Sequence, residues 1–470
     1  MPYIAQGPGS SIRYELASRL GHLPTTTNPQ IRERLARYRK PEDSFDPALI
    51  AERVVPVDAL EQSPTPRIRY VVAVDGSGHE YEEAFDRYPS TRVLYMQIAG
   101  VFIDLNDMLD QSDRFVDPAR LADAMEASVV SGFLPGSYLE HEVYQDPTEA
   151  FRAELFYLFS STEVQQRTLL QLLLEVQKHG QPADREAAAR GEILLSKCPN
   201  RDCVLNRPNR GFGGIPVPAQ EATFCPECSK SLWPTDILRI YEAFKPDAPN
   251  KEALGRCHQV IEHLILLGVA LSFEQLSPRL LPQTAFLYDG DLAIFGEPAP
   301  LHTGLLGTWQ ALWSRCLSRG HQPPVVVGVA KRGYPVEHLR GIRRFIPRRH
   351  LMRLDDFYMR ELLRVSSLTE TYFGRKFFYH AADGQLLVLT VPPVNGEAYS
   401  KKDKNDLSEL HRFPTLARTF EVCDRLGSRL YDDALIPVAL AHNWAAYPLA
   451  NAERVLRVLT EQTIKGKGNN

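Results

Sequence analysis

The run Ile68-Arg-Tyr-Val-Val-Ala-Val-Asp75-Gly-Ser-Gly78 decides how this 470-residue chain is interpreted. Residues 68–74 are rich in β-branched and apolar types and predict a strand, and the turn-forming cluster that starts at Asp75 is expected to close it. The same pattern recurs at Phe286-Leu-Tyr-Asp289-Gly-Asp-Leu292. A residue just past the carboxyl end of a strand lies at the sheet edge where α/β proteins bind ligands. We therefore expect Asp75 and Asp289 to meet at one edge of a sheet.

Two aspartates on neighbouring strands suit a hard divalent cation, because Mg²⁺ and Mn²⁺ prefer oxygen ligands. The alternative is that each Asp-Gly pair only forms a turn, which is a common use of that dipeptide. A third carboxylate is expected from Glu262, which shares an apolar helical stripe with Ile265 and Leu266. A carboxylate on such a face is costly unless it is paired, protonated or bound to metal. Glu154, in another predicted helix, is the competing candidate.

The rest of the chain mixes strands with helices, which predicts an α/β fold. Helical periodicity is expected over about Thr148–Lys178 and near Arg256–Gly268, and a buried strand at Val325–Ala330. Residues 1–50 are polar and rich in Arg and Pro, and we interpret them as an N-terminal arm that contacts a partner or a second copy of the chain. The main domain is then expected to span residues 51–470.

Four of the seven cysteines form two pairs inside an otherwise aperiodic segment, residues 190–235. The pairs are Cys198 with Cys203 and Cys225 with Cys228. Zn²⁺ binds four thiolates tetrahedrally, and each short-spaced pair can supply two sulfurs from one tight turn. Four unrelated buried cysteines are the alternative. With all four positions filled by protein, the predicted zinc ribbon is a structural insertion in the main domain.

The composition is that of an ordinary globular protein, with 44% hydrophobic residues and a formal net charge of −4. A polycation that coats nucleic acid is excluded, so any DNA binding has to come from a local basic face. The odd number of cysteines fits a reducing compartment. No secretory signal pattern is visible, and the most apolar helical stretch, Val260–Leu271, is interrupted by Glu262 and His263. A cytoplasmic protein without a membrane segment is expected.

A basic face is predicted within Lys331–Arg353, where eight positive residues accompany one acid. Guanidinium groups can hold phosphate oxygens in bidentate fashion, although a solvated surface is the plain alternative. The DNA-binding candidates are Arg332, Arg340, Arg343, Arg344, Arg348 and Arg349. Lys331 directly follows a predicted strand and is placed to reach a phosphate oxygen. His442 follows an apolar run, where a core or capping histidine is the more frequent outcome.

Together these motifs resemble those of the NurA family of nucleases, and they occur in the family's order. The matching segments are Val74-Asp75-Gly-Ser77, the helix with Glu262, Leu287-Tyr-Asp289-Gly-Asp-Leu292, Val327-Gly-Val-Ala-Lys331 and Pro437-Val-Ala-Leu-Ala-His442. They cover roughly residues 68–450. The chain departs from the family pattern in its four-cysteine insertion and at Asp291, where a smaller or apolar residue is common.

The resemblance implies an RNase H-like mixed sheet flanked by helices and Mn²⁺- or Mg²⁺-dependent cleavage of DNA, on single strands and duplex ends. It implies Asp75, Glu262 and Asp289 as metal ligands, with Lys331 and His442 at the scissile phosphate. It also implies a homodimer that works with a HerA-type hexameric translocating ATPase, in DNA end processing or in phage defence.

Two other functions stay open on the residues alone. Asp289-x-Asp291 after a strand resembles the nucleophile motif of haloacid dehalogenase-like phosphatases, although Ala293 stands where that motif has Thr or Val. The second alternative is a non-catalytic zinc-ribbon protein that binds DNA or acts as a scaffold.

Overall fold

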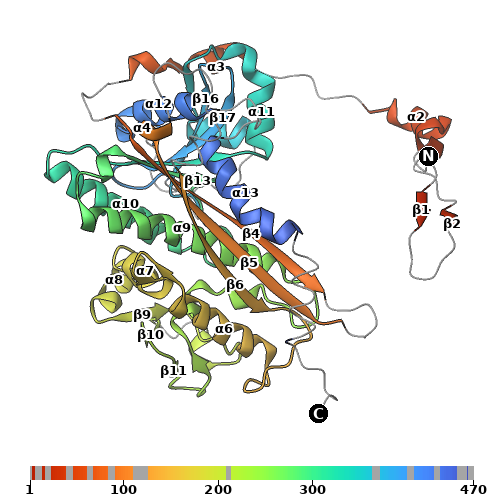
Figure 1. Ribbon diagram of the computed structural model, residues 1–470, viewed down its shortest axis with the longest axis vertical. Coiled ribbons are helices and arrows are strands. Elements are labelled where there is room, and N and C mark those ends of the chain that lie inside the picture. The colour runs from red at the N-terminus through yellow and green to blue at the C-terminus, as the bar shows by residue number, and fades with distance from the viewer. Residues whose placement is uncertain are drawn as a thin grey trace. The chain divides into compact units, whose positions relative to one another are not determined.

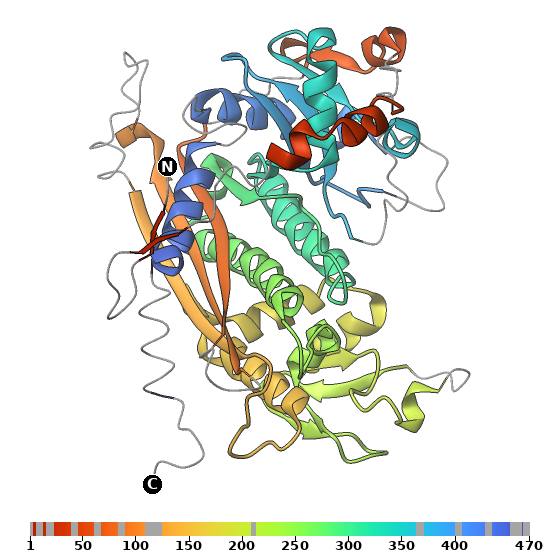
Figure 2. The same ribbon diagram turned by 90° about the vertical axis from the view of Figure 1, so that its right-hand side faces the viewer.

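The structure of the protein, a computed structural model, describes residues 3–5, 13–15, 23–38, 46–60, 67–82, 90–108, 125–207, 213–362, 371–399, 407–427, 435–451 and 463. The chain divides into two compact units, Met1–Ile50 and Ala51–Asn470. All predicted site residues lie in the second unit, whose sheet and helices are drawn in Figure 1 and Figure 2.

In the described part of the second unit, nine strands form one mixed sheet in the order β3-β15-β16-β17-β14-β13-β4-β5-β6. Their bounds are β3 (Val54–Pro56), β4 (Tyr70–Glu82), β5 (Arg92–Asp104), β6 (Met125–Pro135), β13 (Thr284–Asp289), β14 (Val325–Ala330), β15 (His350–Arg353), β16 (Arg375–His380) and β17 (Leu386–Val391). β4, β13 and β14 are parallel, and β5 lies antiparallel between β4 and β6. Within β6-β5-β4-β13-β14, β5 alone therefore runs against the others. This is an RNase H-like arrangement, and the predicted α/β fold is confirmed.

The expectation that the strand closes at Asp75 is wrong. β4 continues beyond this residue, because β5 pairs with it over its whole length. The glycines that suggested a turn instead allow a helix to cross close above the strand. A β-carbon on Gly76 would lie 2.5 Å from Oε1 of Glu262, and one on Gly78 would clash with the ring of His258. Glycine is needed here for close approach and not for a turn.

Helices cover both faces of this sheet (Figure 1, Figure 2). The longer ones are α9 (Lys251–Leu276), α10 (Leu301–Ser318), α11 (Tyr334–Ile342), α12 (Leu416–Leu426) and α13 (Ile436–Asn451). Val74 of β4 shares a hydrophobic cluster with α9 and α10, whereas Ala73 shares another with α12 and α13. Since side chains alternate along a strand, Asp75 points to the α13 face and Gly76 to the α9 face.

Among the described residues, α9 is the one helix long and apolar enough to cross a membrane by length and composition. However, 67% of its most apolar window is buried inside the fold. Its buried apolar side chains belong to the larger hydrophobic cluster, together with residues of β4 and α7 (Leu169–Gln177). The helix is apolar because it is the central helix on its face of the sheet.

The helix predicted over Thr148–Lys178 is in fact two helices, α6 (Pro147–Ser161) and α7. Between them β7 (Glu163–Val164) pairs with β8 (Arg167–Thr168) in a short hairpin. Its turn residues, Gln165 and Gln166, have φ angles of 49° and 68°. Left-handed backbone cannot continue a right-handed helix. Apolar periodicity on both sides of the hairpin hides this break in the sequence.

The four-cysteine segment folds into a lobe of short strands. After α8 (Pro182–Ala189), β9 (Glu192–Leu195) pairs with β10 (Ile215–Pro218), and β11 (Thr223–Phe224) pairs with β12 (Ser231–Leu232). The lobe is tied to α6 by buried Arg152, which donates to both oxygens of Asp236 (2.8 and 2.6 Å) and to the carbonyl of Ser231 (2.6 Å). The lobe is therefore anchored to the main domain through a buried ion pair.

The first unit holds only short elements in its described part. They are β1 (Tyr3–Ala5), β2 (Arg13–Glu15), α1 (Leu23–Thr27) and α2 (Pro29–Leu35). α3 (Pro47–Ala51) lies at the boundary between the two units, and α4 (Leu105–Met108) belongs to the second unit. α2 begins at Asn28, whose side chain accepts a hydrogen bond from the Gln30 amide at 2.9 Å. None of the residues of α2 is buried. The described side chains of this helix therefore form no buried core of their own.

Candidate metal centre

Asp75 and Asp289 meet where β13 ends. The two strands pair in parallel with Tyr288 opposite Val74, so the residues that follow, Asp289 and Asp75, lie side by side. One oxygen of each carboxylate and one ring nitrogen of His442 lie within 4.8 Å of one another. We call these three residues the Asp75 cluster. Ligand atoms around one Mg²⁺ lie roughly 3 to 4 Å apart, since each is about 2 Å from the ion. The cluster is compact enough to hold one divalent cation.

Two further contacts hold the carboxylates of the Asp75 cluster in place. His442, on α13, has its Nδ1 2.6 Å from Oδ2 of Asp75, and 55% of the histidine side chain is exposed. Lys331, directly after β14, donates from Nζ to Oδ2 of Asp289 at 2.5 Å. The ammonium group offsets negative charge at the point where the two carboxylates converge. The structure thus brings Lys331 and His442 to the same place as the aspartates.

Glu262 approaches this place from the opposite face of the sheet. It is buried on α9, and its Oε2 accepts a hydrogen bond from the Tyr288 hydroxyl at 2.8 Å. Its Oε1 lies against Gly76, where a side chain would exclude it. Its oxygens are not among the mutually close atoms of the Asp75 cluster. Glu262 therefore lies behind the cluster, on the other side of β4.

Burial makes both buried carboxylates of this site hard to ionise. Burial and the negative charge of Asp289 raise the pKa of Asp75 to about 6, against the opposing effects of His442 and Lys331. Burial and the charge of Asp75 raise the pKa of Glu262 to about 8, although the hydrogen bond from Tyr288 opposes this. A concentration of buried acids with raised pKa values is typical of sites that bind cations or move protons.

Glu154, the competing third carboxylate, lies elsewhere. It is on α6, where its Oε1 is 3.5 Å from Nε2 of His141. It lines a hollow between α6 and β6, together with Phe133 and Tyr157. Of the two glutamates, Glu262 is the one that borders the Asp75 cluster.

Asp291 is engaged by residues from the other half of the sheet. Its Oδ1 accepts hydrogen bonds from the buried ammonium of Lys376 and, at 3.0 Å, from the hydroxyl of Thr390. The intervening Gly290 has a φ of 127°, and its N–H donates to the carbonyl of Val329 at 2.9 Å. The Asp-x-Asp motif does not present a second free carboxylate, so the phosphatase alternative is not favoured.

The arginines of the predicted basic face are all exposed, but they do not gather at the Asp75 cluster. Arg332 follows Lys331 at the start of the segment. The other five, along α11 and the turns before β15, are Arg340, Arg343, Arg344, Arg348 and Arg349. β15 is separated from β13 by β16, β17 and β14. The segment therefore leads from the cluster to the far side of the sheet, where Arg349 pairs with Asp58 at 2.8 Å.

The four paired cysteines converge in the lobe. Their sulfur atoms all lie within 4.8 Å of one another. The Sγ atoms of Cys198 and Cys228 are 3.6 Å apart, and those of Cys203 and Cys225 are 3.8 Å apart. A tetrahedral ion with Zn–S bonds of about 2.3 Å places its sulfurs about 3.8 Å apart. The arrangement therefore fits one zinc ion held by thiolates alone.

Three groups around the site are not predicted by the sequence. The sequence predicts Tyr288 only as part of a strand, although its position before Asp289 places it on the opposite face, toward α9. Gly76 is predicted to lie in a turn. Lys376 is buried in β16 and is remote in sequence from its partner Asp291. The Gly-x-Gly spacing inside a strand was the one available signal, since it indicates close approach of another element.

Fold and site together define a class: an α/β protein with an RNase H-like sheet and a carboxylate–histidine cluster at the end of a central strand. No protein-family model and no curated protein sequence matches the chain. Solved structures similar to it include the NurA nuclease from Sulfolobus solfataricus, with a TM-score of 0.36 and 10% identity over 96% of this chain and 99% of that one. Another structure of NurA has a TM-score of 0.28 and 9% identity over 96% and 99% of the two chains.

A third similar structure, NurA with manganese, has a TM-score of 0.22 and 11% identity over 94% of this chain and 98% of that one. These structures carry the name of the family that the sequence motifs resemble. At TM-scores of this size the likeness does not bear on function.

We predict that replacing Glu262 with Gln stabilises the metal-free protein at alkaline pH. A pKa raised from 4.5 to about 8 means that the folded state binds the proton more tightly than the unfolded chain does. The stabilisation from this group is complete below about pH 4.5 and is lost as the pH rises through 8. Thermal unfolding in EDTA should show a higher Tm for Glu262→Gln than for the wild type at pH 8.5, and a smaller difference at pH 5.

Glu274, on the same helix, is the matched control. Arg315 and Arg319 outweigh its partial burial and hold its pKa below the usual value. Glu274→Gln should therefore lower Tm at pH 8.5. If Glu262→Gln also lowered Tm at that pH, the carboxyl would not be destabilised by burial in the folded state.

Proposed function

We propose that this chain is a divalent-metal-dependent nuclease that hydrolyses phosphodiester bonds of DNA, on single strands and at duplex ends. The observation that carries the proposal is the meeting of Asp75, Asp289, His442 and Lys331 at the end of β13. A phosphodiester needs positive charge at its non-bridging oxygens and a proton for its leaving oxygen. The order of the motifs, which resembles that of the NurA family, supports the same reaction.

Asp75 and Asp289 would hold a Mn²⁺ or Mg²⁺ ion, because carboxylate oxygens are the ligands that these cations prefer. When bound, the cation supplies Lewis-acid charge to the phosphate and lowers the pKa of an attacking water. Glu262, across β4, adds a third carboxylate, which favours a divalent over a monovalent cation. The buried acids then ionise together with cation binding.

Lys331 and His442 provide the groups that act on the phosphate. The ammonium of Lys331 has three N–H donors, of which Asp289 takes one. Within the described part of the chain, two therefore remain for non-bridging oxygens. His442 is held by Asp75 through Nδ1. Nε2 is then the ring nitrogen left to protonate the leaving oxygen, in the way that a carboxylate orients a catalytic histidine.

We also propose that Cys198, Cys203, Cys225 and Cys228 bind one structural Zn²⁺ ion. The support is the sulfur–sulfur spacing, which suits Zn–S bonds of normal length. Four thiolates leave no position for water or substrate, so this ion takes no part in the reaction. Retention of four thiols requires a reducing compartment such as the cytoplasm.

The family resemblance leads us to propose a homodimer that docks on a HerA-type hexameric translocating ATPase, in DNA end processing or phage defence. The docking element would be the arm, residues 1–50. Ile31, Leu35 and Tyr38 are spaced four and three residues apart along and just after α2, which places them on one face. Leu35 and Tyr38 are 64% and 80% exposed. An apolar stripe that is largely exposed among the described residues is suited to ordering on a partner.

We predict that Asp75→Asn and Asp289→Asn each lower Mn²⁺-dependent cleavage of single-stranded DNA by roughly 100-fold or more, the scale for losing preorganised charge at a reacting centre. Asp58→Asn, which removes an exposed aspartate far along the sheet, should leave cleavage unchanged. Cleavage of a labelled oligonucleotide with Mn²⁺, then with EDTA, measures this.

Two results would point to the other functions. Release of phosphate from p-nitrophenyl phosphate that depends on Asp289 but not on Asp75 would indicate a phosphatase. DNA binding without any metal-dependent cleavage in the wild type would indicate the non-catalytic scaffold.

Protein purified without added zinc should contain about one equivalent of zinc, as a closed four-thiolate site does. Cys225→Ser should lose the metal and lower Tm. Cys423→Ala, which alters a buried cysteine outside the lobe, should keep the metal. Elemental analysis of folded protein with no zinc would rule out this site.

Replacing Leu35 and Tyr38 together with Asp should weaken binding to the ATPase by about tenfold or more, as expected for two central apolar contacts of an interface. Gln30→Ala, which changes an exposed polar residue of the same helix, serves as control. Binding is measured by surface plasmon resonance, with cleavage of free DNA as a check on the metal site. Equal binding by all three proteins would place the docking surface outside the arm.

A further inference from the structure

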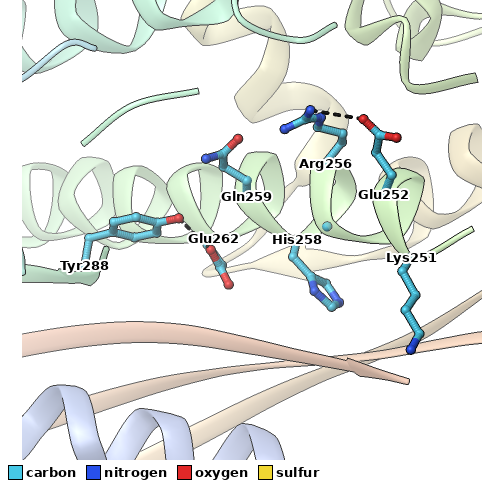
Figure 3. A pocket seen from close by; sticks show the side chains of 8 residues that line it. Lys251, Glu252, Arg256, His258, Gln259, Glu262 and Tyr288 are labelled. Carbon is cyan, nitrogen blue, oxygen red and sulfur yellow. Dashed lines mark hydrogen bonds and ion pairs between the residues drawn. The ribbon is translucent and has the colours of Figure 1, made fainter. Parts of the chain in front are cut away.

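An open groove runs along the first half of α9, beside Glu262. One part, about 400 Å³, is lined by α9 residues from Lys251 to Glu262 and by Tyr288 (Figure 3). A smaller part, about 260 Å³, is lined by residues 78–80 of β4. The two parts share Lys251 and His258 among their lining residues, so they form one continuous groove between the helix and the strand.

The end of the groove that Glu262 lines lies across β4 from the Asp75 cluster. β13 pairs with β4 only as far as Val74, and beyond that point β4 pairs in the described structure with β5 alone. One edge of β4 is therefore open from Asp75 onward. Glu262 borders both the groove and, through Gly76, the cluster. A chain that passes through the cluster can continue into the groove along this edge.

The side chains that line the groove leave nitrogen atoms for a ligand. Gln259 uses its Oε1 to accept a hydrogen bond from the amide of Phe295 at 2.8 Å, so its NH₂ group is left to face the groove. Nε2 of His258 is buried and has no hydrogen-bond partner in the described part of the chain. In Figure 3, His258 and Lys251 extend from α9 on the side of β4. These side chains can bind a ligand in the groove, and the proposed reaction does not use them.

The acids of the groove are already engaged. Glu252 lies 3.3 Å from the guanidinium of Arg256, and Glu80 accepts a hydrogen bond from the amide of Asn250 at 2.7 Å. Lys251 is exposed, whereas Arg256 is paired with Glu252 and Glu297. Among the described lining residues, the groove therefore presents hydrogen-bonding groups and one cation, Lys251, that no ion pair within the described part of the chain engages. This suits a base and sugar followed by a phosphate better than it suits a row of phosphates.

We infer that this groove is a nucleotide subsite, which receives the unpaired nucleotide next to the bond that is cleaved. The inference rests on the proposed nuclease function. The larger part alone has the volume of a small-molecule site, which is typically about 300 Å³ or more. Gln259 bonds the edge of the base, and Lys251 contacts the next phosphate. A base that is paired and stacked in a duplex cannot enter, so the subsite selects single-stranded DNA.

The test uses the full-length protein with Mn²⁺ and two single-stranded substrates, a thymidine oligonucleotide and an abasic oligomer with the same phosphates. Gln259→Ala should raise KM for the thymidine substrate about fivefold or more, the scale of one lost base contact, with a smaller change in kcat. It should leave KM for the abasic substrate unchanged. Lys251→Ala should raise KM for both substrates. Gln275→Ala, at the far end of α9, should change neither.

The outcomes separate this inference from the proposed function. A wild type that does not cleave DNA overturns both. A wild type that cleaves, with Gln259→Ala unchanged on the thymidine substrate, overturns the subsite and leaves the nuclease. Equal losses on both substrates in Gln259→Ala also overturn it, because they show that the groove contacts the backbone and not the base. Matching Tm values for the variants and the wild type establish that the changes are local.

Discussion

The parallel register of β4 and β13 is the constraint on which the site depends. Tyr288 lies opposite Val74, so Asp289 and Asp75 follow at the same level and on the same face. A shift of one residue in either strand would turn one carboxylate toward α9 and separate the pair. The register is held by burial, because every residue of β13 before Asp289 is buried and packs against one of two hydrophobic clusters or the strands beside it. Packing in the sheet interior thereby places the reactive groups.

Alternation along β4 explains why the site has two sides. Asp75 and Asp289 face α13, which supplies His442, while Gly76 and Tyr288 face α9, which supplies Glu262. A third carboxylate on the same side would add repulsion at close range. The position of Glu262 behind β4 keeps its charge near those of Asp75 and Asp289, and the hydrogen bond from Tyr288 fixes the orientation of its carboxylate. Gly76 is what makes this possible, since any side chain there would occupy the place of the glutamate oxygen.

The sequence predicts the positions of those site residues that directly follow or end a strand. Asp289 and Lys331 each stand at the end of an apolar run, and the structure places both where those runs predict. The continuation of β4 past Asp75 was not predictable in this way, because it comes from pairing with β5, whose contribution is not visible in the residues of β4. The engagement of Asp291 by Lys376 is likewise a long-range contact across the sheet. The hairpin that splits α6 from α7 was hidden by apolar periodicity on both sides.

The four-cysteine lobe is linked to the site through the helices beneath the sheet. Its cysteines belong to the same hydrophobic cluster as α7 and α9. α7 packs so closely on α9 that a β-carbon on Gly268 would lie 2.8 Å from Leu172. On its other side, α9 is pressed against Gly76 and Gly78 of β4. Because close-packed interiors transmit strain, a change in how the lobe packs on α7 would be passed on through α9. It would reach Glu262, whose oxygen fits beside β4 only because Gly76 has no side chain.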